Sequence, residues 1–289
     1  MQKFYVEDCP KNRTVAMWIK EQLLEWTPAA KQLYYESDYA KYMNVVFKFK
    51  GDVKGLQESF DTGIATYGKF GWKSAEGEDP TYSGISVTHN PNLQYDDHNI
   101  HNSNLGTSKN HQADFYMGSS VNHEFVKDSY LDGMSFNELT PAASYGYLGE
   151  LLRSIQKNVT ITRSRIGIVS GKTAHYPMFH CDVDTFELTR LNIPIRSNDC
   201  FAFQFEGAEP YVLEEGKAYT WQTRMPHRVL CYEPTNIDRS NLVIGWSPWL
   251  SYNYEERYWY TNQYYLKKHP FDMLVDGDVT DQIELIGMF

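Results

Sequence analysis

Short β-type segments recur through the second half of the sequence, and they limit the folds open to the chain more than any other feature. Each segment is rich in Val, Ile, Leu, Phe, Tyr or Trp, and Gly, Pro, Asn and Asp stand in the intervals. Many short strands without intervening helices indicate an antiparallel barrel or sandwich, a group that includes the jelly roll and its cupin-like relatives. The segments span residues 163–170, 188–195, 201–206, 218–222, 227–232 and 241–249.

The first half of the chain has a mixed pattern. Residues 13–26 and 145–159 place apolar side chains at helical spacing, so we expect a helix in each. Residues 42–50 and 84–89 predict strands. Polar residues dominate between these two strands and again from residue 90 to 120, which predicts long loops.

This change of character predicts three parts in a mainly β protein with flanking helices. We expect a mixed α/β region over residues 1–150 that packs on the core, a β core over residues 151–250 and an extension over residues 251–289. A chain of 289 residues is long enough to bury a sizeable core.

Composition excludes some classes of function. The net charge of −10 argues against a nucleic-acid-binding protein, which needs a basic face. No apolar run approaches the ~20 residues of a membrane-spanning helix, and the first residues contain no apolar signal segment, so we expect a cytoplasmic protein. The cysteines show no paired spacing and are interpreted as free thiols. They are Cys9, Cys181, Cys200 and Cys231.

One stretch departs from the acidic composition. From Leu151 to His180 the chain has five cations and no Asp or Glu, the cations being Arg153, Lys157, Arg163, Arg165 and Lys172. Two interpretations are equally supported: the stretch borders a site for a small anion, or it forms a solvated basic surface.

The motif His180-Cys181-Asp182 lies inside the β-rich half, and His227 follows 45 residues after Asp182. On a strand, residues i and i+2 project to the same face, so His180 and Asp182 can point into a barrel together. Two imidazoles and one carboxylate leave three positions open on Fe(II), which suits binding of a bidentate cosubstrate and then O2. A His-x-Asp motif alone is common, and the alternative is a polar turn after Pro177.

Arg239 strengthens the metal interpretation. It lies 12 residues beyond His227, at the start of the next predicted strand. A guanidinium group matches a carboxylate with two parallel hydrogen bonds. Arg239 could therefore hold the far carboxylate of a dicarboxylic acid whose other end binds the metal.

Three stretches of the sequence resemble the aspartyl/asparaginyl β-hydroxylase family and the related free-proline hydroxylases. They are HCDVDTFELTRLNIPI, EEGKAYTWQTRMPHRV and DRSNLVIGW, within residues 163–249. The resemblance implies a double-stranded β-helix that uses Fe(II), 2-oxoglutarate and O2. It implies His180, Asp182 and His227 as the metal ligands and Arg239 as the partner of the C5 carboxylate of 2-oxoglutarate.

The same resemblance suggests three further contacts to the cosubstrate. Arg190 resembles a family arginine that helps to hold 2-oxoglutarate, and Asn192 occupies a place where some relatives carry a histidine. Ser170 could add a hydroxyl to the C5 carboxylate. Strand alternation puts Ser170 on one face with Ile166 and Ile168, and we expect this face to point into the barrel and Arg165 to point outward.

The implied activity is hydroxylation of an unactivated C–H bond in an amino acid or peptide side chain of the Asp, Asn or Pro type, with succinate and CO2 as co-products. Two alternatives stay open: a non-catalytic cupin-like protein that binds a small acid, and a metal-dependent isomerase or hydrolase on the same barrel. Neither alternative explains the three ligands and Arg239 together. The sequence does not decide between a free amino acid and a peptide, nor does it give the oligomeric state.

Other residues of the sequence offer further candidate sites. His175 with Asp184 is a second choice for the metal, although this pair lacks the i, i+2 geometry. Arg224 and Arg228 flank His227, either as contacts to an acidic substrate or as solvated cations. Cys181 and Cys231 are expected to be small core residues. A second metal cluster or a hydrated polar loop could be formed by Asp96, Asp97, His98 and His101.

Overall fold

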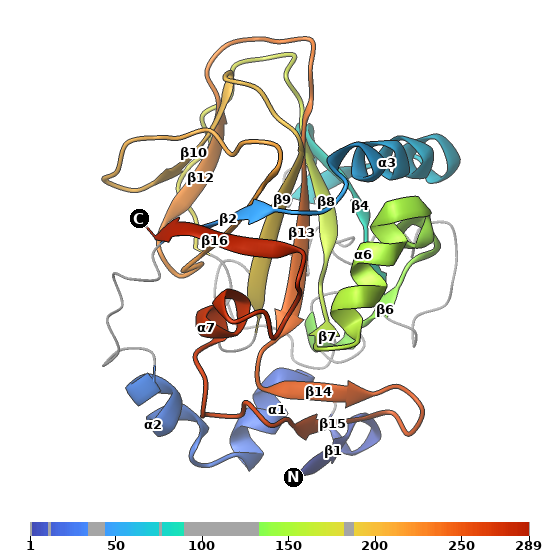
Figure 1. Ribbon diagram of the computed structural model, residues 1–289, viewed down its shortest axis with the longest axis vertical. Helices are drawn as coiled ribbons and strands as arrows, with labels where there is room; N and C mark the ends of the chain where they lie inside the picture. The colour runs from blue at the N-terminus through green and yellow to red at the C-terminus, as the bar shows by residue number, and fades with distance from the viewer. Residues whose placement is uncertain are drawn as a thin grey trace.

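The computed structural model describes residues 2–10, 13–33, 44–74, 77–89, 133–181 and 188–288 (Figure 1). Its largest sheet has the strand order β16-β2-β11-β9-β13-β8-β4-β3, with β7 paired to β13, and its pairings are antiparallel. The strands are β2 (Asn44–Phe49), β3 (Phe70–Ser74), β4 (Gly77–Ser86), β7 (Thr160–Ile161), β8 (Arg165–Val169), β9 (Thr189–Arg196), β11 (Lys217–Trp221), β13 (Arg239–Ser247) and β16 (Ile283–Met288). We call this the main sheet.

A second sheet lies beside the main sheet and is built around β10 (Phe201–Phe205) and β12 (His227–Cys231). Residues 175–180 run antiparallel along β12, because His175 bridges Cys231 and His180 bridges His227. Beyond β10, Tyr211 bridges Phe203. The order across the second sheet is therefore residues 175–180, β12, β10 and Tyr211.

The chain alternates between the two sheets. It passes from β8 to residues 175–180, back to β9, across to β10 and Tyr211, back to β11, across to β12 and finally to β13. This path produces the order β8-β13-β9-β11 in the main sheet. The fold is a double-stranded β-helix, and the predicted mainly β jelly roll with flanking helices is confirmed.

Helices cover the outer face of the main sheet, where α3 (Val53–Tyr67) and α6 (Gly146–Gln156) lie side by side (Figure 1). The Asp52 side chain accepts a hydrogen bond of 2.9 Å from the Gly55 amide and so caps α3. The outer-face side chains of the sheet and the inner faces of both helices form one apolar cluster. It includes Leu56, Phe60, Leu148, Leu152, Ile166, Ile168, Leu191, Ile193, Leu242 and Ile244.

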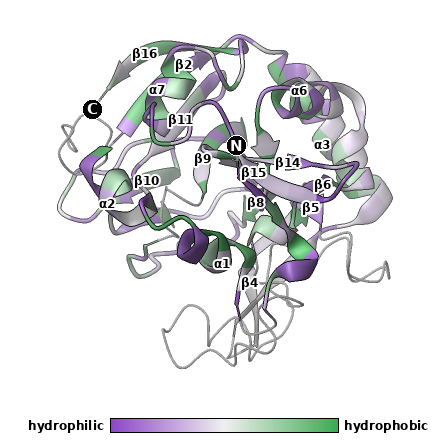
Figure 2. Ribbon diagram, turned by 90° about the horizontal axis from the view of Figure 1, so that it is seen from below, coloured by the Kyte–Doolittle hydropathy of each residue, from purple (hydrophilic) through white to green (hydrophobic). Residues whose placement is uncertain are grey.

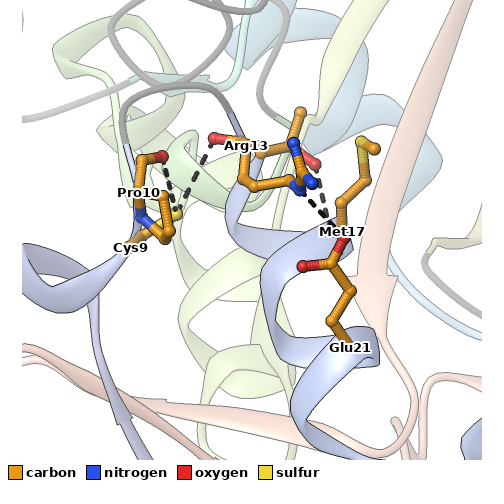
Figure 3. A network of polar contacts seen from close by, with 6 residues as sticks. Cys9, Pro10, Arg13, Met17 and Glu21 are labelled. Carbon is orange, nitrogen blue, oxygen red and sulfur yellow. Dashed lines mark hydrogen bonds and ion pairs between the residues drawn. The ribbon is translucent and has the colours of Figure 1, made fainter.

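The N-terminal residues and part of the C-terminal region form a smaller layer (Figures 1 and 2). Thr14 caps helix α1 (Val15–Gln22), since its hydroxyl accepts a hydrogen bond from the Met17 amide. Arg13 forms an ion pair of 2.8 Å with Glu21 of the same helix (Figure 3). Trp249 and Trp259, both fully buried, form its apolar centre together with Ile19. The elements of this layer are β1 (Lys3–Tyr5), η1 (Val6–Asp8), α1 (Val15–Gln22), α2 (Trp26–Lys31), β14 (Leu250–Asn253) and β15 (Tyr258–Thr261).

The remaining elements are short: β5 (Thr88–His89), η5 (Gly133–Ser135), β6 (Glu138–Leu139), η6 (Pro141–Ser144) and α7 (Pro270–Val275). Four strands of the main sheet come from outside residues 151–250, namely β2, β3, β4 and β16. Within the part of the chain that the structure describes, no helix is long and apolar enough to cross a bilayer.

Two sequence-based expectations about local structure are wrong. Residues 51–83, between two expected strands, were expected to form a polar loop but contain α3, β3 and most of β4. The orientation of β8 is also reversed, since Ile166 and Ile168 pack on the outer side with the helices. Val169 instead packs between the sheets with Phe201 and Cys231. Both faces of this sheet are covered, so apolar side chains do not identify the barrel interior.

Candidate metal and anion site between the two sheets

His227, the first residue of β12, is held in one tautomer. Its Nδ1 lies 2.8 Å from the Met225 carbonyl oxygen, which can only accept, so Nδ1 carries the hydrogen. In the neutral ring Nε2 then presents its lone pair, as a metal-binding histidine requires. The ring is 4% exposed and is stacked on Phe203, with centroids 5.5 Å apart, while Trp221 meets it edge-on.

His180 lies directly opposite His227. Each residue donates its backbone amide to the carbonyl of the other, at 3.0 and 2.9 Å. Directly opposed residues of an antiparallel pair project to the same face, and the two ring centroids are 4.7 Å apart. The His180 side chain is exposed, in contrast to that of His227. The fold thus brings together two of the three predicted ligands at an accessible edge.

Asp182, the third predicted ligand, lies outside the described residues, as does Asp184. Across the described ranges, no three His, Cys, Asp or Glu side chains are grouped closely enough to hold a metal. The pair of histidines needs one further ligand from elsewhere. Asp182, two residues beyond His180, stays the prediction for it.

Arg239 begins β13 and points between the two sheets. Its opposite residue on β8 is Val169, which packs against the second sheet, so the two side chains share that face. Arg239 is only 6% exposed, and burial lowers its pKa to about 10, with Tyr82 opposing the shift. No described carboxylate pairs with it. At neutral pH it is therefore a buried cation that needs an anion.

Neighbouring amides on the same face have unused hydrogen-bonding capacity. Asn241 on β13 donates through Nδ2 to Asn192 Oδ1 on β9, at 2.9 Å. The other amide atoms, Asn192 Nδ2 and Asn241 Oδ1, are buried and have no partner among the described residues. The same holds for Asn44 Oδ1 and Trp221 Nε1, which lie opposite each other on β2 and β11. Buried polar atoms normally have partners, so this face suits a polar ligand or ordered water.

There is also room on this face. A Cβ atom added at Gly167 would meet no atom of the described residues within 4 Å. Gly167 lies opposite Asn241 and two residues from Val169, the partner of Arg239. A buried cation, amide atoms without a partner among the described residues and open space beside them fit a small organic acid.

The other predicted cosubstrate contacts divide into two groups. Arg190 and Asn192 are buried on the inner face of β9, opposite Gly245 and Val243 of β13. Ser170 follows the outer-facing Ile168, and its hydroxyl accepts a hydrogen bond from the Lys172 amide at 3.4 Å. Strand β8 therefore does not direct Ser170 into the interior, as was expected. Arg165 shares the inner face with Gly167 and Val169, so the expectation that it faces outward is wrong.

Arg228 has a structural role that favours neither of its two earlier interpretations. Its Nε and Nη2 donate to Gln204 Oε1 at 2.9 and 2.7 Å, and its Nη1 donates to the Pro177 carbonyl at 3.4 Å. Its guanidinium also lies over the Phe179 ring, 4.3 Å from the centroid. These contacts fix the segment that ends in His180 to the second sheet. Arg224 is exposed.

We therefore expect Arg228→Ala to weaken metal binding by about tenfold, because His180 loses its support. Calorimetric titration with Co(II), a redox-stable substitute for Fe(II), measures the change. Arg153→Ala, an exposed arginine on α6, is the matched control and should bind as tightly as the unmodified protein. Equal affinity in the Arg228 variant would show that the segment is held by other contacts.

His175 lies away from the histidine pair, whereas Cys181 directly follows His180. His175 Nε2 lies 2.9 Å from the Tyr82 hydroxyl, at the opposite end of β12. Cys231 is buried in the core as expected, whereas Cys181 is exposed. Asp96, Asp97, His98 and His101 lie outside the described residues.

Sequence reasoning missed several residues of the site. Tyr82 comes from β4 and reaches Arg239 through a pairing of distant segments, so nothing local marks it. Trp221 could have been found, because alternation from Tyr219 puts both rings on one face of β11. The Met225 carbonyl has no signature at all, since every residue carries one.

Comparison with known proteins gives distant structural likenesses. A scan against protein-family models and a search of curated proteins both found no match. A prolyl hydroxylase from Trichoplax adhaerens, in complex with a hypoxia inducible factor peptide fragment, is 11% identical, with 86% of this chain and 98% of that chain covered and a TM-score of 0.36. HygX from Streptomyces hygroscopicus, with nickel, 2-oxoglutarate and hygromycin B bound, is 8% identical, with 72% and 84% covered and a TM-score of 0.36.

The α-ketoglutarate-dependent epimerase SnoN from nogalamycin biosynthesis is 11% identical, with 76% of this chain and 83% of that chain covered and a TM-score of 0.38. Likenesses this distant do not by themselves establish an activity. The resemblance to the aspartyl/asparaginyl β-hydroxylase family stays a prediction from the sequence motifs.

Proposed function

We propose that the chain is an Fe(II)- and 2-oxoglutarate-dependent oxygenase that hydroxylates a C–H bond of an amino acid or a peptide side chain. One observation carries the proposal. His227, fixed in a metal-binding tautomer, pairs directly with His180, and the buried cation Arg239, which pairs with no carboxylate of the described residues, belongs to the same interior. A protein that only stores a metal has no need of a buried cation without a counter-charge.

In this proposal His180, Asp182 and His227 hold Fe(II). Arg239 pairs with the C5 carboxylate of 2-oxoglutarate, and Arg190 and Asn192 contact the cosubstrate from β9. Bound together, Fe(II), 2-oxoglutarate and O2 supply an oxidation that yields succinate, CO2 and a hydroxylated product. His180 and His227 lie on the second sheet and Arg239 lies on the main sheet, with the interior between them, which supports this assignment.

The protein contributes orientation and exclusion of water. Phe203, Phe205 and Trp221 surround the His227 ring and would shield this ligand from water when a metal is bound. Arg239 is buried, which strengthens its attraction for a carboxylate. His180 is the exposed member of the pair, so we place the approach of the substrate on its side.

The substrate class, an Asp, Asn or Pro residue or the free amino acid, rests on the motif resemblance. The direct test is incubation with Fe(II), ascorbate and labelled 2-oxoglutarate, with and without a panel of amino acids and peptides. We expect succinate formation that rises with one member of the panel. Tight binding of 2-oxoglutarate without any succinate would instead favour the non-catalytic cupin-like binding protein.

The open space at Gly167 allows a sharper test of where the cosubstrate lies. Gly167→Leu should weaken 2-oxoglutarate binding by roughly tenfold or more, because the new side chain occupies that space. Binding of Co(II) alone should not change, since the histidines are on the other sheet. Calorimetry measures both affinities.

Ser170→Leu is the matched control for Gly167→Leu, three residues away on the outer side of the strand. We expect it to keep the 2-oxoglutarate affinity within about twofold. If Ser170→Leu blocks 2-oxoglutarate and Gly167→Leu does not, the cosubstrate does not occupy the interior beside Asn241.

A further inference from the structure

A cavity of about 740 Å³ lies on the outer face of the main sheet, between α3 and the loop of residues 234–238. Its floor is formed by Phe60 and Ile64 from α3 and by Ile168 from β8. Successive strand residues point to opposite faces, so Ser240, which lines this cavity, points away from the interior that receives Arg239. The cavity is therefore separated from the histidine pair by the thickness of the sheet.

Two polar side chains at the base of this cavity have unused donors. Ser240 is 1% exposed, and its hydroxyl has no partner among the described residues. Arg196 lies directly opposite Ser240 on β9. One guanidinium nitrogen of Arg196, Nη2, donates to Asp61 at 2.6 Å. A guanidinium group has five N–H donors, so Arg196 keeps others for a ligand.

The charge of the cavity is positive in an acidic protein. Its lining contains Lys69, Lys172 and Arg196 and one carboxylate, Asp238, which lies 3.4 Å from Lys69. Asp61, which is not part of the lining, pairs with Arg196, so the remaining positive charge belongs to Lys172. Lys172, at the mouth, has no ion-pair partner in the part of the chain that the structure describes. The whole chain carries a net charge of −10, so a local excess of cations favours an anion at this place.

We propose that this cavity binds a small organic carboxylate with an apolar body. The carboxylate accepts from the Ser240 hydroxyl and Arg196 and is attracted by Lys172, while the apolar body lies on Phe60, Ile64 and Ile168. The volume is in the range of small-molecule sites, roughly 300–1,000 Å³. The proposal does not depend on the oxygenase activity, because none of these residues faces the histidine pair.

Octanoate is a suitable probe, with octan-1-ol and octylamine as neutral and cationic controls of the same length. Methyl-labelled isoleucine allows binding to be followed by NMR. We expect octanoate to shift the methyl signals of Ile64 and Ile168 and to leave that of Ile19 unchanged, because Ile19 belongs to the smaller layer. Octanol and octylamine should bind much more weakly.

Two variants test the polar contacts. Lys172→Glu should weaken octanoate by about tenfold or more, and Ser240→Ala by about tenfold, because a hydrogen bond to a charged group is lost. Lys157→Glu, at an exposed lysine on the end of α6, is the matched control and should have no effect.

The proposal is overturned by any of three results. Octanoate up to about 10 mM could leave the Ile64 and Ile168 signals in place, which excludes binding stronger than about 1 mM. Octanol could bind as tightly as octanoate, or Lys172→Glu could bind as tightly as Lys157→Glu. Succinate formation should be unaltered in Lys172→Glu. A failure of the carboxylate-site proposal can therefore be told apart from a failure of the oxygenase proposal.

Discussion

Arg239→Met is expected to weaken the binding of 2-oxoglutarate by roughly tenfold to a hundredfold or more. The reason is the loss of a charge-assisted, bidentate contact between buried groups, which is worth about 1.5–3 kcal/mol. The same substitution should raise the free energy of unfolding of the ligand-free protein by about 1 kcal/mol or more. Burial lowers the pKa of Arg239 to about 10, which means that the folded protein holds this charge at a cost.

Calorimetry with 2-oxoglutarate and denaturant unfolding without it measure the two effects. Arg239→Lys should restore binding only in part, because an ammonium lacks the planar fork. Arg153→Met, at an exposed position on α6, should change neither quantity. An unchanged affinity in Arg239→Met would transfer the role to another cation, Arg190 or Arg165. A large loss of stability would make Arg239 a structural residue instead.

His227→Ala is expected to lower metal affinity by more than about a hundredfold and to abolish succinate formation. Loss of a group that merely supports a ligand already costs about 10- to 100-fold, and here the ligand itself is removed. The fold should survive, because the His180–His227 bridge is made by backbone atoms. Titration with Co(II) and circular dichroism test the two statements.

His175→Ala is the matched control for this variant. His175 lies on the same segment as His180 but at the other end of β12, where it meets Tyr82. Its replacement should leave the metal affinity unchanged. Equal losses of metal affinity in the two variants would support His175 as a metal ligand and contradict the assignment of His227.

Much of the fold could be predicted from the sequence, because the patterns that indicate short strands and turns are local. Short β segments with turn residues between them predicted the jelly roll, and the strand boundaries agree closely with β9, β10, β12 and β13. Helix α3 escaped prediction because Gly55 and Gly63 lower its intrinsic propensity. Its stability comes from packing Leu56 and Phe60 on the sheet, which is tertiary information.

The candidate site divides in the same way. The two histidines and Arg239 were proposed as site residues from their residue types and their spacing in the sequence. The positions of these residues relative to one another depend on strand register. Register pairs residues that are far apart in the chain and cannot be predicted from one segment alone. The orientation of β8 failed for a related reason: Ile166 and Ile168 serve the layer of helices, while Gly167 leaves space inside.

The most direct test of the account is a turnover under isotopically heavy O2. The protein is supplied with Fe(II), 2-oxoglutarate and the panel member that raises succinate formation, and both products are examined by mass spectrometry. An oxygenase of the proposed kind puts one atom of O2 into succinate and the other into the hydroxylated product. We predict a heavy atom in each molecule of succinate, with no succinate from His227→Ala. Succinate without the heavy atom, or equal succinate from His227→Ala, would contradict the assignment.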